Sequence, residues 1–475
     1  MDQVTLTFSH WLFLFTILTI FTFMIFRRDV VLPSIIGIFA LGFVYNLNNG
    51  VLDALIGSTQ VVFEAFLNAG MVLFDIMLII ALMVAMLKSL QSSGADTLMI
   101  SPLKKLMVNP TAAFFVLGAA MYLAATFFWP TPAVALVGTV LIPVAIRAGL
   151  PAMGAAVAIN LFGHGMALSG DLVIQGATGI TSAAAGLESG DILPYTALFS
   201  FITGFVAIGI AFWAIRRGMA KGKWAVSPPK EALDLGSDQP VKPTWQAKLL
   251  AFIVPLFLFG VVFLMLFRAF SPADNAIQGG SATALLGGTA VTLLLISSFT
   301  TRGTKALDEI VPHLKEGFFF AIKIFAPVIP IAAFFLLGHP SHAETVLGEG
   351  APGYLFELGT AMAHHIGDNA ITLVAGMVII SLLAGMDGSG FSGLPLVGSL
   401  AAGLGGGAGL DVAVLASIGQ VATIFAGGGT LAAWAFGVAA DAGIAGVKPA
   451  DLVRQNFLPV MIGLLVATIV AILII

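Results

Sequence analysis

The chain has 475 residues, of which 59% are hydrophobic and only 9% are charged, a composition typical of a membrane protein with many spans and not of a soluble one. It contains no cysteine, which excludes disulfides, thiolate catalysis and cysteine-ligated metal sites. The formal net charge of −4 comes without a basic cluster, so no nucleic-acid partner is expected.

Apolar segments long enough to cross a bilayer occur in two sets of five, on either side of a charged linker at 216–247. The first set comprises residues 9–26, 31–48, 58–87, 151–180 and 192–215. The second set comprises residues 248–267, 280–299, 316–338, 411–439 and 452–475. Two pairs of shorter apolar segments remain, at 111–148 and 371–408, and each pair turns around at a break that contains glycine or proline. We predict that each pair forms a re-entrant hairpin, which enters and leaves the membrane on one side.

The second half of the sequence repeats the first half at a constant offset. The motif LVGT at Leu136 returns as LVGS at Leu396, 260 positions later. This register holds without a gap from 121–215 onto 381–475, and the breaks in the apolar pattern fall at matching places. An odd number of spans in each half would insert the second half with the opposite orientation, as in the inverted repeats of secondary transporters.

These patterns together predict an all-α membrane protein with two inverted repeats, at residues 1–215 and 248–475. Each repeat is expected to contain five transmembrane helices, one re-entrant hairpin and one broken helix. The broken helices are predicted at 151–180 in the first repeat and at 411–439 in the second.

Lysine and arginine residues indicate how the chain is oriented in the membrane. If the N-terminus is placed outside, nearly all of the 20 lysine and arginine residues fall on the inner side, as the positive-inside rule requires. We therefore predict a protein of the bacterial cytoplasmic (inner) membrane, with both termini outside and the linker 216–247 in the cytoplasm.

Single cysteines test this orientation cleanly, because the native chain has none. In intact cells, Ser237→Cys in the linker should resist a membrane-impermeant thiol reagent, because the bilayer shields the cytoplasm. Ser271→Cys should react, because it follows a span that ends outside. The reverse pattern of labelling would invert the predicted topology.

Four breaks in apolar sequence are expected to meet near the middle of the membrane: the hairpin tips at 129–132 and 387–393, and the broken helices at 160–171 and 420–430. Free N–H groups at half-helix N-termini attract anions, and free carbonyl groups coordinate cations. The small residues at the tips favour a pocket lined by backbone over a packed interface, whereas Trp129 is expected to pack or gate. The predicted substrate- or ion-binding residues are Trp129, Pro130, Thr131, Asn160, His164, Ser169, Asp171, Asp387, Ser389, Ser392, Gln420, Gly428 and Thr430.

Each polar residue in these breaks has a functional and a structural interpretation. Asp171 and Asp387 are carboxylates at membrane depth, where charge is costly and usually functional. Alternatively, Asp387 caps a half-helix and Asp171 pairs with a neighbour. His164 either handles a proton or substrate, or is a buried histidine with satisfied hydrogen bonds. Asn160 and Gln420 occupy equivalent positions in the two repeats, where they either face the site or bridge helices.

Two inverted repeats of five spans, each with a re-entrant hairpin followed by a broken helix, resemble the architecture of the ion transporter superfamily. This group includes divalent-anion/sodium symporters, gluconate and lactate permeases, and sodium/proton antiporters of the malate–lactate type. TPAVALVGTVLIPVAIRAGLP is similar to the hairpin of these families, and GHGMALSGD to their interrupted fifth helix. The resemblance covers nearly the whole chain and implies an elevator-type transporter that forms a homodimer. The tips read WPTP and GSGFSG, where the divalent-anion symporters have Ser-Asn-Thr, so the family within this group stays open.

The function expected from these observations is secondary active transport of a small organic anion, a carboxylate, coupled to Na⁺ or H⁺. The sequence shows no nucleotide-binding motif, so an ion gradient would supply the energy. No enzymatic activity is expected, and no cofactor other than Na⁺ as a coupling ion. The alternative is a Na⁺/H⁺ antiporter in which Asp171 and Asp387 carry the exchange. The expected partners are the small-molecule anion or ion, membrane lipid and a second copy of the chain.

Overall fold

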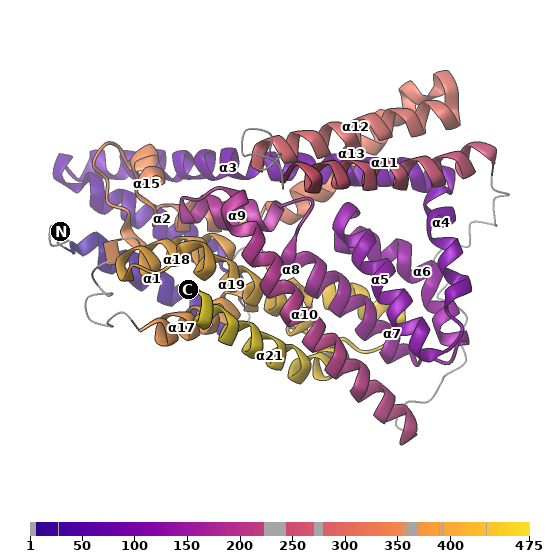
Figure 1. The fold of residues 1–475 in the computed structure, drawn as a ribbon. Helices are drawn as coiled ribbons and strands as arrows, with labels where there is room; N and C mark the ends of the chain where they lie inside the picture. Colours follow the sequence, from indigo (N-terminus) through magenta and orange to yellow (C-terminus); the bar gives the residue numbers. More distant parts are fainter. Residues whose placement is uncertain are drawn as a thin grey trace.

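The structure is a computed structural model that describes residues 6–26, 28–222, 244–269, 279–355, 357–358, 361, 369–388, 390–391, 393–433 and 435–475. Every regular element within these ranges is a helix, which confirms the all-α class (Figure 1). Nine of the described helices are long and apolar enough to cross a membrane, and up to eleven if two bent pairs are counted as spans.

The first half of the chain forms a series of apolar helices that ends before the linker. Its elements are α1 (Phe8–Ile25), α2 (Val31–Asn46), η1 (Leu47–Asn49), α3 (Val51–Ser93), α4 (Ala95–Ile100), η2 (Ser101–Leu106), α5 (Pro110–Phe128), α6 (Pro130–Arg147), α7 (Ala152–Ile159), η3 (Asn160–Ala167), α8 (Leu168–Gly170), α9 (Gly176–Ala185) and α10 (Ser189–Ala220). Local sequence sets several of the boundaries. For example, the Asn109 side chain accepts a hydrogen bond from the backbone N–H of Ala112 and so caps α5.

The second half shows a similar order of elements. They are α11 (Trp245–Ala269), α12 (Gly279–Arg302), η5 (Gly303–Lys305), α13 (Ala306–Phe325), α14 (Val328–Leu336), α15 (Pro340–Leu347), α17 (Ala370–Ala384), η6 (Gly385–Asp387), α18 (Leu394–Ala408), α19 (Val412–Phe425), η7 (Ala426–Thr430), α20 (Phe436–Ala445) and α21 (Pro449–Ile474). A helical pair, a broken helix and a long final helix thus follow one another in both halves. The inverted orientation of the second half stays a prediction.

The helix α3 is longer than the predicted span at 58–87. It has 43 residues, which corresponds to about 65 Å at 1.5 Å per residue. Gly94 ends it in the left-handed conformation, and the chain then bends by 89° between 77–93 and 95–106. Figure 1 shows α3 along one side of the molecule, where α11, α12 and α13 lie beside it.

The two helical pairs lie toward opposite ends of the molecule. In Figure 1, α17 and α18 lie near the end that carries both chain termini, whereas α5 and α6 lie toward the other end, where α10 finishes and α11 begins. We call this second end the linker end. The chain reverses at Trp129 in the first pair, with φ +71°, and within 385–393 in the second.

The broken helices form the centre of the protein. Within the segments Ala152–Gly170 and Val412–Thr430, 94% of the residues are buried, compared with 22% for Trp245–Met265 on the outside. Irregular backbone at membrane depth is tolerated where protein surrounds it. The breaks are therefore covered by other helices, and they bring polar groups into the interior.

Candidate functional site

The break in each central helix is a short π-helical segment, and these two segments, η3 and η7, contact each other. Glycine permits this approach. A methyl group added at Gly165 would lie 2.8 Å from the Phe425 ring, closer than side-chain carbons pack. Gly429 has φ +137°, which favours glycine, and its carbonyl group faces the first broken helix. Widened helical turns of this kind are frequent at functional sites.

A buried histidine–carboxylate pair lies where the broken helices meet. His164 of η3 donates a hydrogen bond from Nδ1 to Oδ2 of Asp441 in α20 at 2.9 Å, and both side chains are 0% exposed. Asn160 donates from Nδ2 to the same carboxylate oxygen at 2.7 Å and to the carbonyl oxygen of Gly429. Asn456 of α21 donates to Oδ1 of Asn160 at 2.6 Å. The cluster therefore ties four segments from both halves of the chain together.

The cluster leaves some acceptor capacity unused. Oδ1 of Asp441 and Oδ1 of Asn456 are buried and have no hydrogen-bond partner among the described residues. An unsatisfied buried acceptor costs free energy unless another species satisfies it for part of the time. A carboxylate with one unused oxygen beside an imidazole can accept a proton, so the cluster is chemically suited to proton exchange.

The tip of the first helical pair contacts this cluster directly. Oγ1 of Thr131 lies 3.4 Å from Nε2 of His164. When the imidazole is neutral with its proton on Nδ1, Nε2 accepts from the threonine hydroxyl, and when it is protonated, Nε2 donates. The charge of His164 thus determines the direction of a hydrogen bond to the tip.

The two hairpin tips touch each other, as predicted. The rings of Trp129 and Phe391 have centroids 5.2 Å apart, and both side chains are almost completely buried. The predicted backbone-lined pocket between the tips stays a prediction, because part of the second tip lies outside the described residues. A methyl group added at Gly390 would lie 2.5 Å from the backbone nitrogen of Gly428, so the second tip is packed against η7.

The second tip is described only in part. Asp387 belongs by its backbone to η6, but its side chain lies outside the part of the structure that is described. Ser389 and Ser392 also lie outside the described residues. Their predicted contribution to binding therefore stays a prediction.

Gln420 connects helices and does not reach the His164 cluster through any hydrogen bond described. Its Nε2 donates to the carbonyl oxygen of Ser169 at 3.1 Å and contacts Oγ1 of Thr178 at 3.3 Å. The Ser169 hydroxyl in turn contacts Oγ of Ser200 at 2.9 Å. Although Asn160 and Gln420 occupy equivalent sequence positions, only Asn160 holds the buried carboxylate.

Asp171 pairs with neighbouring backbone, which is the alternative interpretation given above. Its carboxylate accepts hydrogen bonds from the backbone N–H groups of Gln175 at 3.1 Å and Ala177 at 2.7 Å. These groups lie at the start of α9, where the first N–H groups of a helix lack partners within the helix. Asp171 thus caps α9, and a transport role for it stays a prediction.

The remaining predicted residues line the same central region. Pro130 is the first residue of α6 and is buried. The Thr430 hydroxyl group donates a hydrogen bond to the carbonyl oxygen of Phe425 within the second break. Gly428 provides the backbone against which Gly390 packs. These residues shape the breaks, while Asn160 and His164 belong to the polar cluster and Thr131 contacts it.

Two residues of the cluster were missed by the sequence analysis, namely Asp441 and Asn456. Both are 0% exposed. The signal for Asp441 was present, because it is a carboxylate in the apolar segment FGVAADAGIA, and the principle that singled out Asp171 applies to it equally. Asn456 had a weaker signal, an amide in the first turns of the last span.

Comparison with known proteins shows the family of the chain. It is 37% identical over 469 residues to YhfA of Bacillus subtilis strain 168, an uncharacterized membrane protein, and the match covers 98% of both chains. The chain belongs to the YhfA family. No family model matches the sequence. The relative is a membrane protein, in agreement with the composition of this chain, and the relationship leaves the substrate open.

Two solved structures have a fold similar to that of this chain. Neisseria gonorrhoeae MtrF, described as illuminating a class of antimetabolite efflux pumps, superposes with a TM-score of 0.61 at 15% identity over 90% of this chain and 85% of MtrF. The YdaH transporter of Alcanivorax borkumensis, described as having an unusual topology, superposes with a TM-score of 0.54 at 15% identity over 98% of both chains. The chain therefore has a fold found in membrane transporters.

Proposed function

We propose that this member of the YhfA family is a secondary active transporter that moves a small organic anion across the cytoplasmic membrane, coupled to H⁺. The observation that carries the proposal is the fully buried His164–Asp441 pair at the meeting point of the two broken helices. Ionisable groups at such a depth are costly and usually mark ion or substrate pathways. The fold shared with an efflux pump and a transporter supports the same class of function.

The pair provides a physical link between proton binding and movement of the hairpin. A proton that charges His164 reverses the direction of the hydrogen bond between His164 and Thr131, because Nε2 then donates. Because Thr131 belongs to the first tip, the protonation state favours one arrangement of the tip over another. A coupling ion can shift the equilibrium between two conformations only if it binds one of them more tightly than the other.

The first tip has features that suit an anionic substrate. The indole N–H of Trp129 is buried and has no acceptor among the described residues, and Trp129 has a φ of +71°, which is strained for a bulky residue. The helix α6 begins at Pro130 and directs the positive end of its dipole toward the tip. A carboxylate that enters between the separated tips would accept the indole hydrogen bond. In this proposal, the packed conformation described above is the substrate-free state.

Several further features belong to the same proposal. Transport would follow an elevator mechanism, in which the hairpins and broken helices move together as a unit, within a homodimer. Both termini would lie outside and the linker in the cytoplasm. Na⁺ is retained as an alternative coupling ion, and Asp171 and Asp387 as additional ion-handling residues.

A Na⁺/H⁺ antiporter is the second candidate function. The observation that favours it is again the His164–Asp441 pair, since a carboxylate with an unused buried oxygen can bind either H⁺ or Na⁺. In that case, Asp441 would carry the exchange without any organic substrate.

A ligand screen separates the two functions. Purified protein should gain heat stability from one organic acid in a panel of lactate, gluconate and malate, by about 2.7 kcal/mol at a concentration 100 times the dissociation constant. In proteoliposomes, an imposed pH gradient should then drive accumulation of that acid. Stabilisation by Na⁺ alone, with Na⁺-dependent proton release and no response to any acid, would support the antiporter instead.

A further inference from the structure

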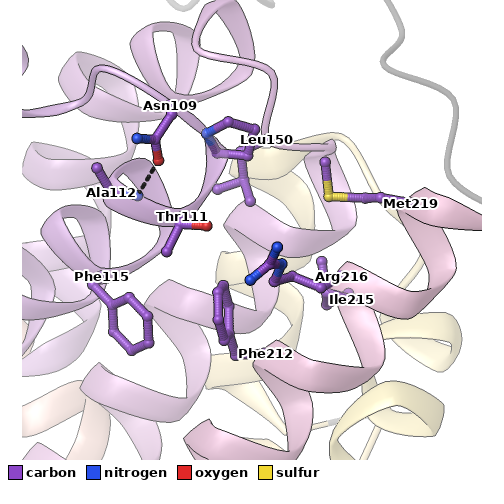
Figure 2. A pocket seen from close by; sticks show the side chains of 10 residues that line it. Asn109, Thr111, Ala112, Phe115, Leu150, Phe212, Ile215, Arg216 and Met219 are labelled. Carbon is purple, nitrogen blue, oxygen red and sulfur yellow. Dashed lines mark hydrogen bonds between the residues drawn. The ribbon is translucent and has the colours of Figure 1, made fainter.

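A cavity of about 550 Å³ opens at the linker end of the protein, between the first turns of α5 and the last turns of α10 (Figure 2). It is distinct from the His164 cluster and shares no lining residue with it. Most of its wall is apolar, with one cation and one hydroxyl group among the side chains. The lining residues used below are Thr111, Phe115, Leu150, Phe212, Arg216 and Met219.

Arg216 is the only charged residue in the described lining of the cavity. Figure 2 shows its guanidinium group pointing into the space between Thr111 and Phe212, and Cζ lies 5.9 Å from the centroid of the Phe212 ring. No described carboxylate forms an ion pair with Arg216. A guanidinium group against apolar walls is complementary to an anion such as a phosphate, which it binds by two parallel hydrogen bonds.

The surroundings place this cavity at the edge of the apolar surface. The ring centroids of Phe115 in α5 and Phe212 in α10 lie 4.8 Å apart, so the two helices are in contact here. Phe115 is 41% exposed and Trp213 is 59% exposed, and Cζ of Arg217 lies 5.2 Å from the centroid of the Trp213 ring. Exposed tryptophan with adjacent arginine, at the end of an apolar helix, is typical of the membrane–water interface. An occupant would therefore lie at the depth of lipid head groups.

We propose that this cavity binds the head-group phosphate of an anionic phospholipid from the leaflet at the linker end. Arg216 binds the phosphate, and the Thr111 hydroxyl donates to one of its oxygens. The glycerol and the first acyl carbons contact Phe115, Leu150 and Met219. Because the cavity lies between a helix of the first hairpin and α10, the bound lipid stabilises the contact between these two elements.

The test uses the purified full-length protein, with phosphatidylglycerol as the probe, in thermal unfolding and native mass spectrometry. Arg216→Gln should weaken phosphatidylglycerol binding at least about tenfold, as expected for loss of the two charge-assisted hydrogen bonds from the guanidinium group. Arg217→Gln is the matched control, since it removes the same charge one residue away, beside Trp213 and outside the cavity lining. Thr111→Asp places a carboxylate opposite Arg216 and should abolish binding, and it gives a second test if Arg216→Gln does not fold.

Each outcome supports or overturns the proposal. Retention of binding in Arg217→Gln and its loss in Arg216→Gln and Thr111→Asp support a specific lipid site. An equal loss of lipid binding in both arginine variants would show that general charge attraction explains the binding, and this result would overturn the proposal. Equal stabilisation by phosphatidylcholine overturns the requirement for an anionic lipid, and equal stabilisation by inorganic phosphate shows a site for soluble phosphate instead.

Discussion

Asp441→Asn is expected to abolish pH-driven accumulation of substrate while leaving the protein folded and able to bind substrate. The carboxamide still accepts the hydrogen bonds that Asn160 and His164 donate to Oδ2, but it does not take up a proton at physiological pH. Downhill exchange of substrate in proteoliposomes should continue, and its rate should depend less on pH than the rate of the native protein. The measurement is uptake with and without an imposed pH gradient.

Two further variants test whether Asp441 couples transport to protons or only stabilises the fold. Asp441→Ala leaves the His164 imidazole and the Asn160 amide buried without their partner, so the free energy of unfolding should fall by about 3–5 kcal/mol. Asp451→Asn is the control, because this carboxylate is 44% exposed and pairs with Arg454 at 3.2 Å on the surface. It should leave both stability and transport unchanged. Full pH-driven accumulation by Asp441→Asn would remove this residue from the coupling mechanism.

Gly437→Ala is expected to disrupt the contact between the two broken helices. A methyl group at this position would lie 2.5 Å from the carbonyl oxygen of Gly428 and 2.6 Å from Cδ2 of His164. Because the first of these atoms belongs to the backbone, relief requires a shift of η7 or of α20. Overpacking of this kind costs about 1–3 kcal/mol. We expect that loss in the free energy of unfolding, together with a loss of transport because the imidazole moves.

Gly443→Ala provides the matched control in the same helix. Nothing lies within 4 Å of a methyl group added there, so the change should be neutral or should stabilise α20 by up to about 1 kcal/mol, the difference in helix propensity. Thermal unfolding and transport of the two variants should be compared side by side. If Gly437→Ala is as stable and as active as Gly443→Ala, the described packing of α20 against His164 does not occur in the working protein.

The structure adds a third buried carboxylate to the two that the sequence singles out. The sequence points to Asp171 and Asp387 as ion-handling residues, or alternatively as a paired carboxylate and a helix cap. In the structure, Asp171 caps α9, whereas Asp441 pairs with His164. The histidine pair contains two groups that can change charge.

The membrane class, most of the spans and the positions of the breaks can be predicted from the amino-acid sequence alone. These features depend on local composition, since apolar length defines a span and glycine or proline interrupts a helix wherever it occurs. The breaks predicted at 160–171 and 420–430 accordingly overlap η3 and η7. His164 was singled out for the same reason, because it lies between two glycines.

Which polar side chains contact one another depends on the packing of helices that lie far apart in the sequence. His164 and Asp441 are 277 positions apart, and Trp129 and Phe391 come from different halves of the chain. Asn160 and Gln420 are equivalent in the repeat, yet one reaches the buried carboxylate and the other joins two helices. Such differences depend on how helices from the two halves pack against each other. Glycine allows two backbones to approach closely, whereas a larger side chain at the equivalent position keeps them apart. The repeat in the sequence fixes equivalent positions along the chain, but packing between the two halves determines the neighbours that each position receives.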